Sequence, residues 1–187
     1  MRRLASVALL IILHVVHAQT INWQAIVSDH GNRLQQTTLT DSQTHNLQRM
    51  LVRHSRTTGQ TWCDKDDTSW VDNLKASDIP IGVAHAMLIE AGQGCARGAQ
   101  GANGAMWLIR WQGPTPVLLG ELAGWPYRVL PHTSHGLHDV TVGWHMSARE
   151  FGLSLFRFDG THYQQAGTAD VVCDDYGKCK ATPSARK

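Results

Sequence analysis

The chain has 187 residues, of which 42% are hydrophobic and 17% are charged. Its 17 Lys and Arg residues stand against 15 Asp and Glu residues, a formal net charge of +2. A chain of this length can bury a sizeable core, and its near-neutral charge argues against nucleic acid and anionic membrane surfaces as partners.

The first 18 residues have the pattern of a secretory signal peptide. Arg2 and Arg3 form a basic start, and residues 4–16 form an apolar run that precedes small side chains. A membrane anchor is the alternative, but the run is shorter than the ~20 apolar residues that span a bilayer. We expect removal of 1–18 to leave one secreted or periplasmic domain, 19–187, with no membrane span. That domain keeps 15 Lys and Arg against 15 Asp and Glu, and therefore no net charge.

The N-terminal part of this domain predicts one helix. Residues 21–27 alternate apolar and polar side chains and are typical of a strand. Thr40 followed three residues later by Gln43 is a capping box, and apolar residues at helical spacing then predict a helix over 41–54. Gly59 is the latest position at which this helix can end.

From residue 80 onward the chain predicts strands separated by turns. The expected strands cover 81–91, 105–111, 117–122, 127–130, 139–145, 152–158 and 161–165. We therefore predict an α+β fold with a short N-terminal helical part and an antiparallel meander of roughly six to eight strands. Such a meander can close into a partial barrel or a propeller-like sheet.

One turn in this meander predicts a register. Asp159-Gly160 lies between two alternating strands, which is typical of a two-residue type I′ hairpin. That turn would place Phe156 opposite Tyr163 on the buried face, and Arg157 opposite His162 on the other face.

Four cysteines remain after signal removal, and an even count in a secreted chain indicates two disulfides. Three pairings are open, and we favour Cys63–Cys95 and Cys173–Cys179, because residues 174–177 look like a turn that the second bond would close. A zinc site is the alternative, although the spacing of the last two cysteines fits a zinc finger poorly.

The stretch 131–145 holds four histidines: His132, His135, His138 and His145. In a regular strand over 139–145, Val140, Val142 and Trp144 would be buried on one face. His138 and His145 would then lie on opposite faces.

The first three histidines lie in an expected loop after Pro131, where His132 and His135 could share a metal ion with one outside ligand. Asp139 could orient an imidazole. Surface histidines and an acid–base role are the other interpretations.

No catalytic motif accompanies these histidines. The chain has no G-x-S-x-G, and Ser134 does not lie on a strand-to-helix elbow. A triad assembled across the fold stays possible, because triads need not be contiguous in sequence. We expect no cofactor, and we favour a protein without enzymatic activity.

The stretch HDVTVGWHMSAREFGLSLFRFDGTHY resembles the strand pairs of small secreted or periplasmic bacterial proteins. Over residues 105–165 the succession of strands and turns is similar to that of FG-GAP or VCBS-type β repeats and of periplasmic lysozyme-inhibitor-like domains. The resemblance implies a β-rich binding domain. The calcium loop D-x-D-x-D-G of the repeats is missing beside Asp139 and Asp159. The inhibitors' S-G-x-x-Y loop is replaced by SAREF, 147–151, so their mechanism does not carry over.

These observations favour a non-enzymatic binding domain for a secreted protein or a cell-envelope ligand, with an inhibitor-like role as one form of such binding. Its binding residues would lie on the loops 92–104, 131–138 and 146–151. The candidate binding residues are Arg97, His132, His135, His138, Asp139 and Arg149. A secreted hydrolase that uses a histidine or a zinc ion, and a structural envelope component, are the alternatives.

Overall fold

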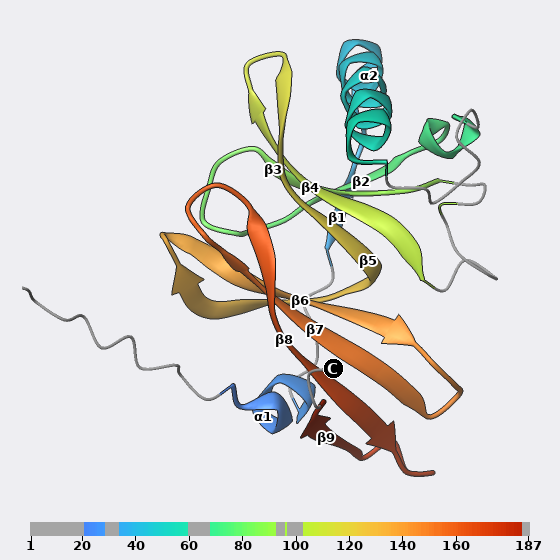
Figure 1. Cartoon of the computed structure of the whole chain (residues 1–187), viewed down its shortest axis with the longest axis vertical. Coiled ribbons are helices and arrows are strands. Elements are labelled where there is room, and N and C mark those ends of the chain that lie inside the picture. The colour runs from blue at the N-terminus through green and yellow to red at the C-terminus, as the bar shows by residue number, and fades with distance from the viewer. Residues whose placement is uncertain (1–20, 29–33, 60–67, 93–95, 97–102, 185–187) are drawn as a thin grey trace, which may run out of the picture.

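In the computed structural model of the protein, nine strands follow one another along the chain and two α-helices pack against them (Figure 1). The structure describes residues 21–28, 34–59, 68–92, 96 and 103–184, and the counts here refer to those residues. The helical elements are α1 (Trp23–Ser28), α2 (Asp41–Thr58) and the 3₁₀ turn η1 (Ser69–Val71). The strands are β1 (Gln35–Thr37), β2 (Lys75–Asp78), β3 (Ala86–Glu90), β4 (Gly104–Gln112), β5 (Thr115–Ser134), β6 (Leu137–His145), β7 (Glu150–Phe158), β8 (Tyr163–Cys173) and β9 (Cys179–Pro183).

The α+β class and the antiparallel meander are confirmed, but the expected partial barrel or propeller is wrong. Each strand pairs with the next, the order is β1 to β9, and the sheet is open. The long strand β5 bends sharply near its middle (Figure 1). Its first half pairs with β4 as far as Gly124, and its second half pairs with β6 from Trp125 onward. We call β1–β4 with the first half of β5 sheet A, and the second half of β5 with β6–β9 sheet B.

Gly124 makes this bend possible. Its φ of 125° is a conformation that side chains rarely adopt, and a Cβ atom there would collide with the carbonyl oxygen of Gly143. The bend folds the second half of the meander over the first, so the two halves pack face to face instead of curving into a closed barrel. This is why regular alternation in the sequence did not reveal the architecture.

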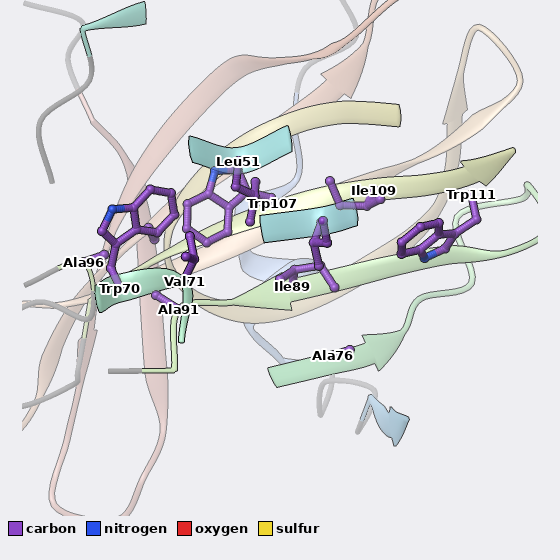
Figure 2. Close-up of a cluster of buried hydrophobic side chains, with 12 residues drawn as sticks. Leu51, Trp70, Val71, Ala76, Ile89, Ala91, Ala96, Trp107, Ile109 and Trp111 are labelled. Atoms are coloured by element: carbon purple, nitrogen blue, oxygen red, sulfur yellow. The ribbon is translucent and has the colours of Figure 1, made fainter. Parts of the chain in front are cut away.

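Three hydrophobic clusters fill the layers. Apolar residues of both sheets meet in the central cluster, with Leu108 from sheet A and Val140 from sheet B among its buried members. The other face of sheet A packs on α2, where Leu51, Trp70 and Trp107 lie close together (Figure 2). The third cluster lies between sheet B and α1; its buried members are Trp23, Ile26, Leu153, Leu155, Ala169 and Val171. The order of layers is therefore α2, sheet A, sheet B and α1.

The predicted capping box is confirmed, and the helix is longer than expected. Gln43 N donates to Thr40 Oγ1 at 3.2 Å, and the Gln43 side chain accepts from Thr40 N at 3.0 Å. Helix α2 continues to Thr58, and Gly59 ends it in a left-handed conformation. The strand expected over 21–27 is wrong.

That segment forms α1 instead. The side chain of Asn22 accepts a hydrogen bond from Ala25 N at 3.0 Å at the start of the helix. Trp23 and Ile26, three residues apart, are both buried against sheet B. Alternation and helical spacing overlap in so short a segment, and tertiary packing decides between them.

The predicted hairpin at Asp159-Gly160 is present, but its register is wrong. Tyr163 lies opposite Phe158 and not Phe156, and the two rings are 5.4 Å apart. The Asp159 side chain accepts hydrogen bonds from Thr161 N and His162 N, each at 2.8 Å. These bonds stabilise a turn two residues longer than the type I′ turn, so the partners shift.

The disulfide Cys173–Cys179 is confirmed and joins β8 to β9 across a turn. The pairing Cys63–Cys95 falls on residues outside the described part of the chain. Of the two disulfides expected, the structure therefore describes one. None of the helices in the described ranges has the length and apolar character that a bilayer crossing requires.

Candidate functional site

A buried carboxylate lies at the end of sheet B. The side chain of Asp139, on β6, is only 1% exposed. It accepts hydrogen bonds from His132 Nδ1 at 2.7 Å, from Ser134 Oγ at 2.6 Å and from Arg157 Nε at 3.1 Å. Burying a carboxylate without such partners would cost several kcal/mol or more, so the three donors explain how Asp139 stays in place.

The hairpin between β5 and β6 brings two of these donors to Asp139. His135 and Gly136 form its turn, and both have positive φ, 48° and 83°. Thr133 pairs with His138 on the turn side, but the register shifts between Val129 and Thr133. The extra residues form a bulge that carries His132 to the carboxylate.

Pro131 lies in this bulge, and the prediction that it ends a strand is wrong. Proline lacks an N–H group, which excludes it from regular ladder positions but not from a bulge. Strand β5 therefore runs through Pro131 to Ser134, and the expected loop 131–138 is a strand hairpin. The third donor comes from β7: because Val140 pairs with Phe156, Arg157 is the cross-strand neighbour of Asp139.

Asp139 lies at the polar end of a pocket between α1 and sheet B. The pocket has a volume of about 630 Å³, within the range of small-molecule sites. Its polar lining includes Arg128, His132, His138, Asp139 and Arg157. Its apolar walls include Ile21, Ala25, Ile26, Val129, Leu130 and Leu155. The pocket thus combines apolar walls with one cluster of polar groups.

The polar groups at this end are mainly hydrogen-bond donors. Arg128 is only 7% exposed, so a second guanidinium lies at the buried end. The Nδ1 atom of His138 is buried and has no hydrogen-bond partner among the described residues. Arg128 and Arg157 bring two positive charges against the single negative charge of Asp139. The residues that line the pocket thus include more cationic than anionic side chains.

Tyr163 joins this cluster through the backbone. Its hydroxyl donates to the carbonyl oxygen of His138 at 2.7 Å. Burial, and then the negative charge of Asp139, raises the pKa of Tyr163 far above its ordinary value. Tyr163 is therefore a neutral hydrogen-bond donor that holds the strand beside Asp139.

The structure brings together only part of the residues expected to bind. His132, His138 and Asp139 line the pocket. His135 lies on the turn, where its Nδ1 atom is 2.8 Å from the Phe158 carbonyl oxygen. Arg149, in the turn between β6 and β7, forms an exposed ion pair with Asp175 in the turn between β8 and β9. Arg97 lies outside the described residues.

His132 and His135 do not share a centre, because one bonds to Asp139 and the other to the backbone of β7. The described part of the chain contains no group of three or more His, Cys, Asp or Glu residues that could hold a metal ion. The prediction of a metal ligand pair depends on an irregular loop over 131–138, whereas these residues form a strand hairpin.

Three residues of the site were missed as binding residues: Arg128, Ser134 and Arg157. The correct register of β6 against β7 would have placed Arg157 beside Asp139, since both belong to amphipathic strands joined by a short turn. Arg128 and Ser134 depend on the bend and the bulge of β5, for which the sequence offers only scattered Gly and Pro residues.

Comparisons of the chain with protein-family models, with curated proteins and with solved structures each found no match.

Proposed function

We propose that the protein is a secreted or periplasmic, non-enzymatic binding domain whose pocket receives a small ligand with an anionic group and an apolar part. One observation carries this proposal. The pocket has apolar walls and a mainly cationic cluster of hydrogen-bond donors around Asp139, whose oxygens already accept hydrogen bonds from protein groups. Secretion is supported by the signal-like start and by a disulfide, which persists in oxidising compartments.

The anionic group is inferred from the balance of donors and acceptors. Both oxygens of Asp139 already accept hydrogen bonds from protein donors, so the carboxylate has little capacity left for a ligand. His132 and Arg157 each have further nitrogen atoms beside the one bonded to Asp139, and Arg128 and His138 also line the pocket. Guanidinium groups match carboxylate and phosphate geometry, so a ligand carrying one of these groups fits best.

The apolar part is inferred from the walls. Ile21, Ala25 and Ile26 of the α1 region face Leu130 and Leu155 of sheet B across the pocket. Burial of hydrocarbon there contributes about 25 cal/mol per Å² of apolar surface removed from water. An alkyl chain or a hydrophobic ring beside the anionic group would therefore add affinity that a small inorganic anion lacks.

Hydrolysis is the second candidate function, because Asp139 orients His132 as a general base would require. The Nε2 atom of His132 has no partner within the described residues. Ser134, however, donates to Asp139 and not to His132, so no activated nucleophile completes a triad. Cleavage of nitrophenyl esters that a His132→Gln variant loses would favour this function over binding alone. A structural envelope component, the third candidate, would show neither binding nor cleavage.

Calorimetric titration with matched probes tests the binding proposal. We expect decanoate and decyl phosphate to bind, and expect decanol, which lacks the charge, and acetate, which lacks the chain, to bind much more weakly. Failure of both decyl anions to bind up to their solubility limits would overturn the proposal.

Two variants locate the binding in the pocket. Arg157→Gln should weaken decanoate binding about 10-fold or more, the loss expected for a charge-assisted hydrogen bond. Arg149→Gln is the matched control, because Arg149 lies in an exposed ion pair away from the pocket. Ala25→Trp should block binding by filling the pocket from α1 without removing a charged group. If Arg157→Gln and Ala25→Trp bind decanoate as tightly as Arg149→Gln does, the ligand binds elsewhere on the protein.

A further inference from the structure

A second surface, on the opposite face of sheet B, presents an exposed indole. Trp144 of β6 is 54% exposed, although the alternation of β6 predicted it to be buried with Val140 and Val142. That prediction is wrong for Trp144 because sheet A covers only the part of this face near the other two residues. The indole is therefore left on the open part of the sheet.

The indole lies down on the sheet instead of projecting from it. A Cβ atom on Gly152, its cross-strand partner on β7, would collide with Nε1 and Cδ1 of Trp144. The five-membered ring thus lies directly over the backbone of Gly152, and a larger residue there would displace it. The ring thus rests on β7, while Trp144 as a whole stays 54% exposed.

Trp125 shows what a structural tryptophan looks like in this protein. It also lies over a glycine, Gly143, but Phe151 packs beside it with ring centroids 5.7 Å apart. None of the ring contacts or hydrogen bonds of the described residues involves the Trp144 side chain. Trp144 therefore has exposed surface and a donor that the described fold does not use.

Polar side chains of both charge signs surround this ring on the same face. The strand register places Asp170 and Thr182 in one row with Gly152, and Val172 and Lys180 in the next row with Glu150. These side chains are exposed. We name the surface formed by Trp144, Glu150, Asp170, Val172, Lys180 and Thr182 the Trp144 face.

We propose that the Trp144 face binds a saccharide chain. The face of an indole carries negative electrostatic potential, which attracts the C–H groups that line one side of a pyranose ring. Sugar hydroxyls both donate and accept hydrogen bonds, and Asp170, Thr182 and Lys180 supply both kinds of partner. The open sheet matches an extended polymer, in contrast to the pocket around Asp139.

The Trp144 face mixes charged side chains with exposed apolar ones, since Val172 is 53% exposed and Met146, just beyond the end of β6, is 55% exposed. The centres of protein interfaces are depleted in charged residues, whereas this face carries an acid or a base in each of its two rows. The proposal does not depend on the pocket, since Asp139 and Trp144 lie on opposite faces of β6.

Native gel electrophoresis in gels containing a soluble polysaccharide tests the proposal with the full chain. Laminarin, dextran and glycol chitin are suitable probes, because they differ in linkage and in the amide group. We expect at least one of them to retard the protein. Trp144→Ala should raise the dissociation constant about tenfold, taking the loss of one base–aromatic stack as the guide. Trp144→Phe should keep part of the binding, and Gly152→Val should lose it by displacing the indole.

Tyr176→Ala is the matched control. Tyr176 is 96% exposed but lies on the turn between β8 and β9, so its removal should leave retardation unchanged. Thermal melting of each variant checks folding, and Trp144→Ala should melt close to the parent protein because the ring is half exposed. Absence of retardation by all three polysaccharides, or equal retardation of Trp144→Ala, would overturn the proposal. Conversion of a dimer to a monomer by Trp144→Ala in sedimentation, without polysaccharide binding, would identify a self-association face instead.

Discussion

Asp139→Asn is the substitution that tests most sharply how the polar cluster is held. It keeps the shape of the side chain but removes the charge, and it replaces one acceptor oxygen with a donor that faces other donors. His132, Ser134 and Arg157 each lose part of their hydrogen bonding, and the charge of Arg157 loses its counter-ion.

The magnitude follows from burial. Hydrogen bonds to a charged group contribute about 1.5–3 kcal/mol each, but the His132 and Arg157 side chains are 43% and 32% exposed, so water replaces part of their loss. We expect the free energy of unfolding to fall by about 3–5 kcal/mol, the cost of breaking a buried ion pair. In a chain of this size that corresponds to a fall in Tm of roughly 6–20 °C.

Urea denaturation followed by far-ultraviolet circular dichroism measures this loss. Asp175→Asn is the matched control, because Asp175 pairs with Arg149 in an exposed ion pair and its loss should cost at most about 1 kcal/mol. A loss below 1 kcal/mol for Asp139→Asn, or one equal to the control, would refute the reasoning that a buried carboxylate organises the site.

Three further predictions concern the stability of the fold, at Tyr163, at Asp159 and at Gly124. Tyr163→Phe should lower the free energy of unfolding by about 0.5–1.5 kcal/mol at pH 7, because the bond from its hydroxyl to the His138 carbonyl is lost. The pKa of Tyr163 is raised in the folded protein, so the stability linked to its neutral form should be complete below about pH 10 and fall as the pH rises further. Denaturation between pH 8 and pH 11 should show this fall in the parent protein and a smaller fall in Tyr163→Phe. The backbone N–H groups of His162 and then Thr161 lower the pKa of Asp159. The stability linked to the charge of Asp159 should therefore be complete above about pH 4 and disappear as the pH falls through the lowered pKa. Acid denaturation of Asp159→Ala should lack this component. Gly124→Ala should destabilise the protein by more than about 1 kcal/mol in thermal melting, since the substitution strains the backbone at a positive φ and collides with the adjoining strand.

Local signals in the sequence were enough to predict parts of the fold. The capping box at Thr40 and Gln43 acts within one helical turn, and Gly59 ends the same helix through its own conformation. The pair Cys173–Cys179 is likewise local, because the turn between the two residues brings them together whatever the rest of the chain does.

The errors arose where distant parts of the chain decide the outcome. Trp144 continues the alternation of Val140 and Val142, but exposure depends on how far sheet A extends over sheet B, which no local pattern encodes. Pro131 ends a strand only if the ladder is regular, and the bulge in β5 makes it compatible. The site around Asp139 combines residues from three strands, so it required the register of each.

The most direct test of the proposed pocket is an NMR titration of the ¹⁵N-labelled protein with decanoate, observed at the Arg157 Nε–H signal. That group donates to Asp139 and lies at the polar end of the pocket. We predict that decanoate shifts this signal and the backbone amide signals of α1 in a saturable manner, while the Trp144 indole signal stays in place. Decanol should shift neither set to the same extent. Unchanged Arg157 and α1 signals at saturating decanoate would contradict the proposal that this pocket receives an anionic ligand with an apolar part.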